Sequence, residues 1–534
     1  KSIKKFLAVI LSMTLMLTLG TATFGAQKTL PSGKDTGSIN VTNLKPGDTV
    51  TAYQFVKADY NEYGFTGYSA INNYVKDPVA PTAQEVIDMA SNAATMTVAA
   101  EKKVATGDTE VTLNGLPVGY YLVMVTSGSE TVYSPMIAGI YYSKSATDNT
   151  LTNGAISADS DFEIKAQKCW AKSSTPKLEK TIVTPSSKNS KGDDIAIGDK
   201  ITFNLSATVP SYSKEYKKVT YKIYDIMSEG LDYVDGSMKC FIEKYENNRE
   251  NIKVTPKVNG GIIEITFDSK FILEHPGQKI QVEYQAKLNE KAGVNFDANI
   301  NKAYLEYSNN PASGSTAKTG EDKVYVYTFG IDSNLFGKST EKWNEKTKEL
   351  IKVEEGEYQW GETEKESGIF TTTTALEGAT FTLTNNKTKK SYTATSDKYG
   401  YLKFTGLDAG EYTLQETDAP DGFTLNDAKH TVVITAEYNQ DGTLKSYTIK
   451  IDDKATSTYT ATYDKGVIKT ITSTKDSQGN ISESAILKNS KMSFLPSTGG
   501  VGTTIFAIVG VVFVAAALGL HMILRGKSKL EQDR

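Results

Sequence analysis

The feature that most constrains this chain is a pair of long apolar runs, one near each end of the sequence. The first, Phe6 to Leu19, follows several lysines and precedes small residues, which predicts a secretory signal over residues 1–26 with cleavage after Ala26. The second, Val501 to Leu524, contains no Asp, Glu, Lys or Arg and is long enough to cross a bilayer. Basic residues follow it, so we expect the final residues to stay in the cytoplasm. The polypeptide between the two runs must therefore fold outside the cell membrane.

The exported segment lacks the covalent scaffold on which many secreted proteins depend. It contains only Cys169 and Cys240, which can form at most one disulfide, and the sequence does not decide whether they pair. The whole chain has three histidines, and His521 lies in the second apolar run, so a zinc site or a His-based catalytic triad has little support. We expect no metal, no cofactor and no enzymatic activity. We expect large cores or another kind of crosslink to hold the fold together.

Composition favours an all-β fold divided into several domains. A chain of 534 residues exceeds what one ordinary core can organise. Its 30 tyrosines, together with runs of Thr, Val and Ile, favour strands, and residues 81–94 form the one segment that suggests a short helix. The formal net charge is −4, and the segment between the ends is more acidic still because both ends are mostly basic. This balance does not indicate a nucleic-acid partner.

A short motif stands immediately before the second apolar run, and it consists of Leu495, Pro496, Ser497, Thr498 and Gly499. Residues 495–534 as a whole, with pentapeptide, apolar span and basic tail, resemble the LPXTG sorting signal of Gram-positive bacteria. Pro496 fixes its own backbone and favours an extended Leu495, a form that can enter an enzyme groove. The resemblance implies that a sortase cysteine attacks the Thr498 carbonyl and that an amine of peptidoglycan or of another subunit releases the acyl-enzyme. The mature protein is then expected at the cell wall, after a transient stay in the membrane.

The exported segment divides into three units. Residues 27–171 form the first. The second, residues 175–323, contains an alternating strand after a turn, Ile197-Gly198-Asp199-Lys200-Ile201-Thr202-Phe203, and resembles the isopeptide-forming domain of fimbrial backbone subunits. The third, residues 324–490, contains Leu414-Gln415-Glu416-Thr417-Asp418-Ala419-Pro420 and resembles the prealbumin-like SpaA or CnaB module of pilins. These resemblances imply tandem immunoglobulin-like and CnaB-type β-sandwiches.

Pilin domains of this kind often crosslink themselves through an amide between Lys and Asn, with a carboxylic acid between them. The reaction needs a neutral lysine, a protonated acid and enforced proximity, and burial favours the first two because it penalises charge. In the second unit the resemblance assigns Lys180 as donor, Asp225 as promoting acid and Asn301 as acceptor, with Asn309 as an alternative acceptor. Without the surrounding motif, Lys180 would be interpreted as an exposed strand residue and Asn301 as a turn residue.

A second internal bond is expected in the third unit on weaker grounds. Glu416 matches the promoting acid of the family, and Asn489, just before the sorting signal, matches the acceptor. Leu335 occupies the place where the family usually carries its lysine, so Lys338 is the nearest substitute as donor. No bond is assigned to the first unit.

Backbone pilins also use an exposed lysine near the end of the first domain, within a Tyr-Pro-Lys core. This chain has Ala166-Gln167-Lys168 at the corresponding place, so the match is degenerate. Lys168 is the first choice for the polymerising lysine, and Lys172 is the second.

These features together resemble those of a backbone subunit of a sortase-assembled pilus anchored to peptidoglycan. The resemblance implies sortase, further copies of the chain, and tip and base pilins as partners, with no defined host or matrix ligand. The alternative is a wall-anchored adhesin or minor base pilin that is not polymerised. Such a protein would share the sorting signal and the CnaB-like unit but would make no use of Lys168.

Overall fold

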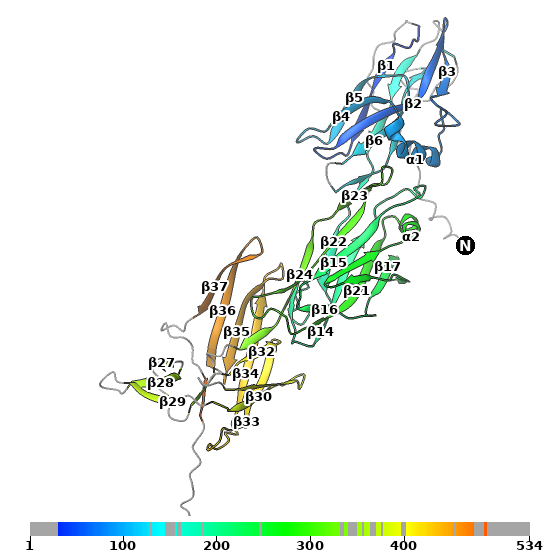
Figure 1. Ribbon diagram of the computed structural model, residues 1–534. Coiled ribbons are helices and arrows are strands. Elements are labelled where there is room, and N and C mark those ends of the chain that lie inside the picture. The colour runs from blue at the N-terminus through cyan, green and yellow to red at the C-terminus, as the bar shows by residue number, and fades with distance from the viewer. Residues whose placement is uncertain are drawn as a thin grey trace, which may run out of the picture.

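The structure of the protein, a computed structural model, consists of three β-rich domains that follow one another end to end (Figure 1). Within the residues that it describes, no helix is long and apolar enough to cross a membrane. The predicted secretory signal, the sorting motif and the second apolar run lie outside these residues. The described residues are 30–127, 130–144, 155–156, 162–183, 185–244, 248–331, 336–339, 350–354, 357–363, 370–374, 377–396, 402–452, 454–474 and 485–488.

The first domain packs two sheets around an apolar core. One sheet has the strand order β10-β1-β5, and the other has the order β3-β2-β6-β8-β9 with β4 beside β2. Helix α1 begins where Thr82 and Glu85 form a reciprocal capping box, within the segment predicted to be helical. The elements are β1 (Thr36–Thr42), β2 (Thr49–Asn61), β3 (Gly64–Ala70), α1 (Ala83–Ser91), the 3-10 helix η1 (Ala93–Thr95), β4 (Val98–Lys103), β5 (Glu110–Pro117), β6 (Gly119–Thr126), β7 (Val132–Tyr133), β8 (Met136–Ser143), β9 (Glu163–Ala166), β10 (Lys168–Trp170) and β11 (Ser173–Ser174).

The second domain is a sandwich of two larger sheets. One has the order β12-β14-β21-β17-β18 with β16 beside β21, and the other has the order β13-β24-β22-β15-β20-β19 with β23 beside β22. Side chains alternate between core and surface along β12, β15 and β22, as the period of a strand requires. The elements are β12 (Leu178–Ile182), β13 (Gly192–Asp194), β14 (Lys200–Thr208), β15 (Tyr221–Met227), β16 (Leu231–Tyr233), β17 (Lys239–Lys244), β18 (Asn248–Ile252), β19 (Lys257–Asn259), β20 (Ile262–Thr266), α2 (Ser269–Glu274), β21 (Lys279–Leu288), β22 (Asn299–Asn310), β23 (Ser315–Lys318) and β24 (Asp322–Tyr327).

The third domain is organised around a sheet with the order β31-β30-β33-β34-β35-β36-β37. Three smaller groups accompany it: β25 pairs with β32, β26 pairs with β38, and β27, β28 and β29 form a sheet of their own. The strands are β25 (Phe329–Ile331), β26 (Phe336–Ser339), β27 (Leu350–Glu354), β28 (Glu357–Thr363), β29 (Phe370–Thr374), β30 (Thr380–Asn385), β31 (Ser391–Thr395), β32 (Phe404–Leu407), β33 (Gly410–Asp418), β34 (Lys429–Tyr438), β35 (Leu444–Ile451), β36 (Lys454–Asp464), β37 (Val467–Thr474) and β38 (Ala485–Lys488).

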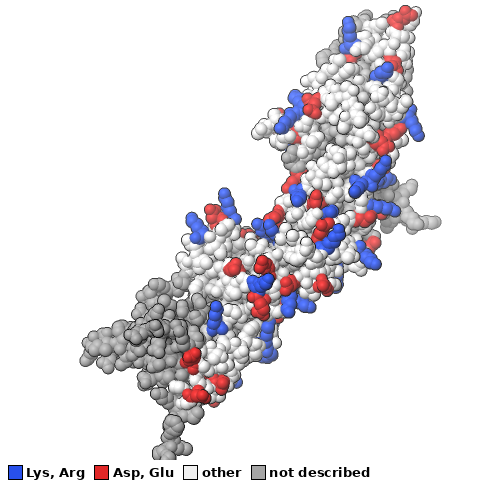
Figure 2. All heavy atoms as spheres, viewed as in Figure 1, with Lys and Arg blue, Asp and Glu red and all other residues white. Residues whose placement is uncertain are grey.

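The described architecture confirms the predicted class of tandem all-β sandwiches. The expected boundary between residues 323 and 324, however, falls inside a strand. β24 pairs with β22 and β13, so the sheet of the second domain continues to Tyr327. Charged side chains of both signs are interspersed along the face shown in Figure 2. That face therefore presents no broad field of a single sign.

The first and second domains share buried contacts at their junction. Ile87 of α1 and Val132 of β7 are buried in the core cluster of the second domain. The Tyr307 hydroxyl of β22 donates to the carbonyl oxygen of Glu130. The linker strand β11 pairs with β7, which ties the chain leaving the first domain back onto it. The two domains are therefore packed against each other and not merely connected by a linker.

The junction between the second and third domains depends on a close backbone approach. A Cβ at Gly192 would lie 2.2 Å from the carbonyl oxygen of Gly442, which itself has a positive φ of 89°. Only glycine leaves room for this contact. Next to it, the buried carboxylate of Asp194 accepts hydrogen bonds from the Tyr438 hydroxyl at 2.6 Å and from the Ala409 amide. The Asp194 side chain of the second domain thus accepts hydrogen bonds from two donors of the third domain.

Burial at this junction raises the pKa of Asp194 from 3.8 to about 6. Removal from water is the largest cause, and the hydrogen bonds from Tyr438 and Ala409 oppose it. The neighbouring carboxylates of Asp193 and Asp408 raise the pKa further. The folded protein therefore binds a proton at Asp194 more tightly than the unfolded chain does.

This difference predicts how Asp194 contributes to the pH dependence of stability. Because the folded state holds the proton more tightly, the contribution of Asp194 falls as pH rises from about 4 to about 6 and stays constant above that range. Asp194→Asn, which does not titrate, should therefore gain stability relative to wild type across this window. Denaturant unfolding at a series of pH values measures the difference in stability between the variant and wild type. Asp232→Asn, at an exposed position, is the control. A wild-type-minus-variant difference that does not change between pH 4 and pH 6 would contradict the assignment.

Candidate crosslinking site

Lys180 lies on the inner face of β12, where a lysine is not expected. Burial alternates along this strand, so that Leu178, Lys180 and Ile182 face the core while Glu179 is exposed. The side chain of Lys180 is 0% exposed, and its amine lies 4.9 Å from the centre of the Phe203 ring. The surrounding aromatic and apolar side chains keep water away from this amine.

Asp225 and Asn301 come from the opposite sheet. Asp225 lies on β15 and Asn301 on the neighbouring β22, where Met227 pairs with Asn301 and Asp225 pairs with Ala303. Both side chains are 0% exposed because the same two-residue alternation turns them inward. The structure therefore brings the three residues assigned to the second unit into one buried cluster between the sheets.

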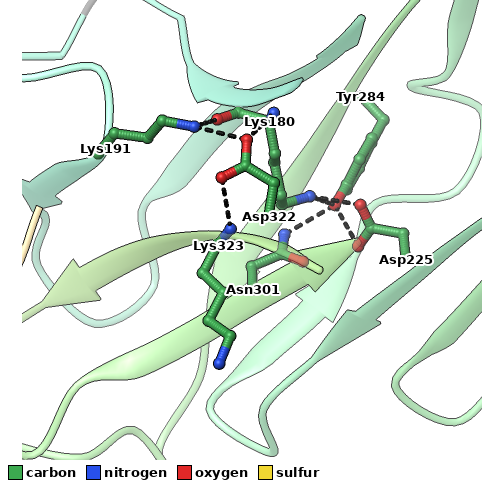
Figure 3. A network of polar contacts seen from close by, with 7 residues as sticks. All are labelled: Lys180, Lys191, Asp225, Tyr284, Asn301, Asp322 and Lys323. Carbon is green, nitrogen blue, oxygen red and sulfur yellow. Dashed lines mark hydrogen bonds and ion pairs between the residues drawn. The ribbon is translucent and has the colours of Figure 1, made fainter. Parts of the chain in front are cut away.

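The cluster is organised around the hydroxyl of Tyr284, which lies on β21 (Figure 3). Lys180 Nζ contacts Asp225 Oδ2 and lies 3.0 Å from the Tyr284 oxygen. The Tyr284 hydroxyl donates to Asp225 Oδ1 at 2.7 Å and accepts from Asn301 Nδ2 at 2.7 Å. A single oxygen thus contacts the lysine, the acid and the asparagine.

Burial sets the electrostatics of the cluster. It lowers the pKa of Lys180 because the ammonium form is removed from water, and the Asp225 carboxylate opposes this effect. It raises the pKa of Tyr284 well above 10, so that the phenol keeps its proton. The site therefore favours the neutral amine that an attack on a carboxamide needs.

The carbonyl of Asn301 carries a further sign of reactivity. In the part of the chain that the structure describes, Asn301 Oδ1 is buried and has no hydrogen-bond partner. A buried oxygen without a partner costs free energy in an ordinary core, and such exceptions call for an explanation. Here the amide is held by its nitrogen alone, so its carbonyl group is not stabilised by a donor before reaction.

A second layer of contacts fixes the backbone of β12. Asp322 Oδ2 accepts from the Lys180 amide at 2.7 Å and from Lys191 Nζ at 2.6 Å (Figure 3). Lys191 Nζ also donates to the carbonyl oxygen of Lys180 at 2.6 Å. These bonds hold β12 beside β24 and fix the position from which the Lys180 side chain enters the core.

The alternative acceptor Asn309 is placed elsewhere. It lies farther along β22, and its Oδ1 accepts from the Ser315 hydroxyl at 2.8 Å in an exposed contact. The polar contacts of the Lys180 amine are with Asp225 and Tyr284. The geometry therefore favours Asn301 over Asn309 as the partner of Lys180.

The residues assigned to the third unit are only partly covered by the structure. Glu416 lies on the inner face of β33, is 1% exposed, and accepts from the Asn426 amide at 2.7 Å. β26 and β38 pair in parallel, with Lys338 opposite Leu487. The structure does not describe the Lys338 side chain, and Asn489 lies outside the described residues. This site stays a prediction.

The candidate polymerising lysines lie at the surface of the first domain. Lys168 begins β10, which pairs in parallel with β1, and alternation leaves Lys168 and Trp170 exposed on one face with Cys169 buried on the other. Lys172 is exposed as well, just beyond the strand. The sorting residues Leu495, Pro496, Ser497, Thr498 and Gly499 lie outside the described residues.

Tyr284 was not among the predicted site residues, although its position in the strand is unusual. The inward positions of β21 are otherwise apolar, with Ile280, Val282, Ala286 and Leu288 at every second residue. Tyr284 is the one hydroxyl-bearing member of that series. A polar group at a core position of a strand needs a partner, so the pattern marks Tyr284 as a residue with a buried polar contact but does not identify that partner.

Three family descriptions match separate parts of the chain. The T6 antigen Ig-like domain matches residues 34–173, the SpaA prealbumin-like fold domain matches residues 369–450, and the LPXTG cell wall anchor motif matches residues 488–529. The SpaA match confirms the predicted resemblance of the third unit. The anchor match contains the predicted sorting motif and confirms the predicted location at the cell wall.

Similarity to known proteins extends over nearly the whole chain. The chain is 26% identical to the trypsin-resistant surface T6 protein of Streptococcus pyogenes serotype M6 over 549 residues, covering 93% of this chain and 96% of the relative. Its fold is similar to that of the T6 backbone pilin of the same serotype, with a TM-score of 0.58, 21% identity, and coverage of 87% and 100%. The major pilin SpaD from Corynebacterium diphtheriae aligns with a TM-score of 0.47 and 16% identity, over 88% of this chain and all of SpaD.

The two cysteines provide a test of the core assignments. Cys169 and Cys240 are free thiols buried in different domain cores, and burial raises the pKa of each to about 12. We expect almost no reaction of the native protein with a thiol reagent at pH 8, and two labels per chain after denaturation without reductant. Mass spectrometry counts the labels. Labelling of the denatured chain that requires reductant would show a disulfide and contradict the structure.

Proposed function

We propose that this chain, a cell-wall-anchored surface protein with the domains of Gram-positive backbone pilins, is the shaft subunit of a sortase-assembled pilus. The observation that carries the proposal is the similarity to the T6 surface protein over nearly the full length of both chains, anchor included. The fold supports it, because three sandwiches in series form an elongated unit suited to building a fibre (Figure 1). In this role the chain is a structural subunit, and the reactions in which it takes part are those that crosslink it.

Assembly would join two distant parts of the chain. Sortase would cleave between Thr498 and Gly499 and hold the Thr498 carbonyl as an acyl-enzyme, and Lys168 of another copy would attack it. Lys168 lies in the first domain, whereas the sorting motif follows the third, which lies at the other end of the described molecule (Figure 1). Joining unlike surfaces in this way does not close a ring, so the product is a filament.

Anchoring would use the same acyl-enzyme with a different amine. An amine of the peptidoglycan precursor in place of Lys168 ends growth and attaches the fibre to the wall. Sortase, further copies of the chain, peptidoglycan, and tip and base pilins are the partners that this scheme requires. A wall-anchored adhesin or base pilin that is never polymerised is the alternative, and it needs no reactive lysine in the first domain.

The second domain would be closed by an amide between Lys180 and Asn301, promoted by Asp225. The buried contacts among these residues and Tyr284 support the bond, which would join β12 of one sheet to β22 of the other. By analogy with disulfides, closing a loop of this length stabilises the fold by about 5 kcal/mol. The bond would also carry load that hydrogen bonds between strands cannot carry, because every subunit of a one-molecule-wide fibre bears the full tension.

A corresponding bond in the third domain would join Lys338 to Asn489, with Glu416 as the promoting acid. The buried position of Glu416 and the parallel pairing of β26 with β38 support this proposal. Since Asn489 precedes the sorting motif, the bond would pass tension from the Thr498 linkage directly to β26.

The polymer should depend on one surface lysine. Lys168→Ala removes the proposed nucleophile, so we expect cell-wall extracts to lose the ladder of high-mass bands on denaturing immunoblots and to retain the monomer. Lys172→Ala, four residues away and also exposed, is the matched control and should keep the ladder. A ladder that survives Lys168→Ala would reject this lysine, and a single band in wild type would favour the unpolymerised alternative.

Intact mass should count the internal bonds. Each Lys–Asn amide releases one ammonia, so we expect the wild-type chain to be lighter than its sequence by one ammonia for each bond. Asn301→Ala should form one bond fewer and lose on the order of 5 kcal/mol of stability, whereas Asn309→Ala should leave both mass deficit and stability unchanged. Glu416→Ala should remove the bond of the third domain. A wild-type mass equal to the sequence mass would disprove both bonds.

A further inference from the structure

We infer that Tyr284 is a catalytic residue of the Lys180–Asn301 crosslinking reaction, in which its hydroxyl carries a proton from Asp225 to the leaving nitrogen of Asn301. The inference rests on the internal bond proposed above and adds a fourth residue to its mechanism. It starts from an unusual contact pattern. The Tyr284 oxygen lies within hydrogen-bond distance of all three side chains of the cluster.

The position of the hydroxyl relative to the leaving group is the main argument. Conversion of the Asn301 carboxamide to a new amide requires that Nδ2 gain a proton and depart as ammonia. The group that contacts Nδ2 is the Tyr284 hydroxyl, at 2.7 Å, whereas the Asp225 carboxylate contacts Lys180 and Tyr284. Asp225 therefore contacts the nucleophile on one oxygen and Tyr284 on the other, and Tyr284 connects it to the leaving group.

The proton movements balance along this chain of contacts. With Lys180 neutral and Asp225 protonated, Lys180 Nζ bonds to the Asn301 side-chain carbonyl carbon, and the carbonyl oxygen takes the displaced electron pair. Asp225 gives its proton to the Tyr284 oxygen, Tyr284 gives its own proton to Nδ2, and the Asp225 carboxylate takes a proton from Nζ. The bond from the carbon to Nδ2 then breaks with return of the electron pair. One ammonia leaves, and both the acid and the phenol are regenerated.

The surroundings of Tyr284 favour a proton transfer in which the phenol does not become a free phenolate. Tyr284 is fully buried, and its ring packs against Phe203 at 5.5 Å and Tyr233 at 5.9 Å between centroids. Burial raises the pKa of the phenol, so a free phenolate is disfavoured and the proton must leave and arrive in a concerted way. The packed ring also fixes the oxygen, which replaces a diffusing water that this dry core excludes.

The test uses the full chain made by cell-free synthesis, because the reaction can then be timed from translation. Samples are denatured and digested at intervals, and the crosslinked peptide containing Lys180 and Asn301 is quantified by mass spectrometry. Tyr284→Phe keeps the ring and removes the relay, so we expect crosslinking to slow by about 100-fold or more. Tyr233→Phe, the same change in the neighbouring ring, is the control and should react at the wild-type rate.

A second measurement separates catalysis from packing. Fluorinated tyrosines at position 284 keep the hydroxyl and the fold but make the phenol more acidic, and we expect the crosslinking rate to change systematically with that acidity. Equal rates across the series would overturn the inference, whatever the effect of Tyr284→Phe. A wild-type rate in Tyr284→Phe would overturn it as well, with the internal bond intact. A wild-type chain that yields no crosslinked peptide would instead disprove the bond itself.

Discussion

The structure depends on a lysine and an aspartate that are buried together between two sheets. Lys180 and Asp225 are both fully enclosed, and in most cores such a pair costs more in lost hydration than its attraction returns. A pair that only stabilised the fold could be replaced by apolar side chains. A pair that takes part in the proposed crosslink could not, because burial lowers the pKa of the Lys180 amine and the Tyr284 hydroxyl contacts both that amine and the Asn301 carboxamide. The buried pair is therefore more easily explained by the proposed crosslink than by a contribution to stability alone.

The same requirement explains how the domains are connected. In the shaft role proposed above, a subunit would transmit tension through its junctions, and both junctions between the described domains are packed. Ile87 and Val132 enter the core of the second domain, while Asp194 accepts donors from the third. Covalent closure of a domain would serve little purpose if the chain between domains opened first. The packed junctions and the proposed internal bonds would act together in a subunit under tension.

The fold class, the sorting motif and three residues of the candidate site could be predicted from the sequence, each for a different reason. The sorting motif is linear, so its order and spacing are visible without a structure. Lys180, Asp225 and Asn301 were found through the resemblance to fimbrial subunits, whereas their inward positions are seen only in the structure. Tyr284 was not predicted because its role arises from contact across two sheets, which no local pattern encodes. The end of the second domain was misplaced for a similar reason, since only pairing with β22 and β13 shows that β24 belongs to it.

The central claim is that a covalent bond across the second domain takes the load. Pulling a single molecule by its two ends measures this directly. If Lys180 is joined to Asn301, the chain between them is shielded from force, and the second domain releases none of that length at any force below covalent rupture. If the bond is absent, unfolding of this domain adds a step of roughly 400 Å for those residues, at about 3.3–3.6 Å per residue. Such a step in the wild-type protein would contradict the account.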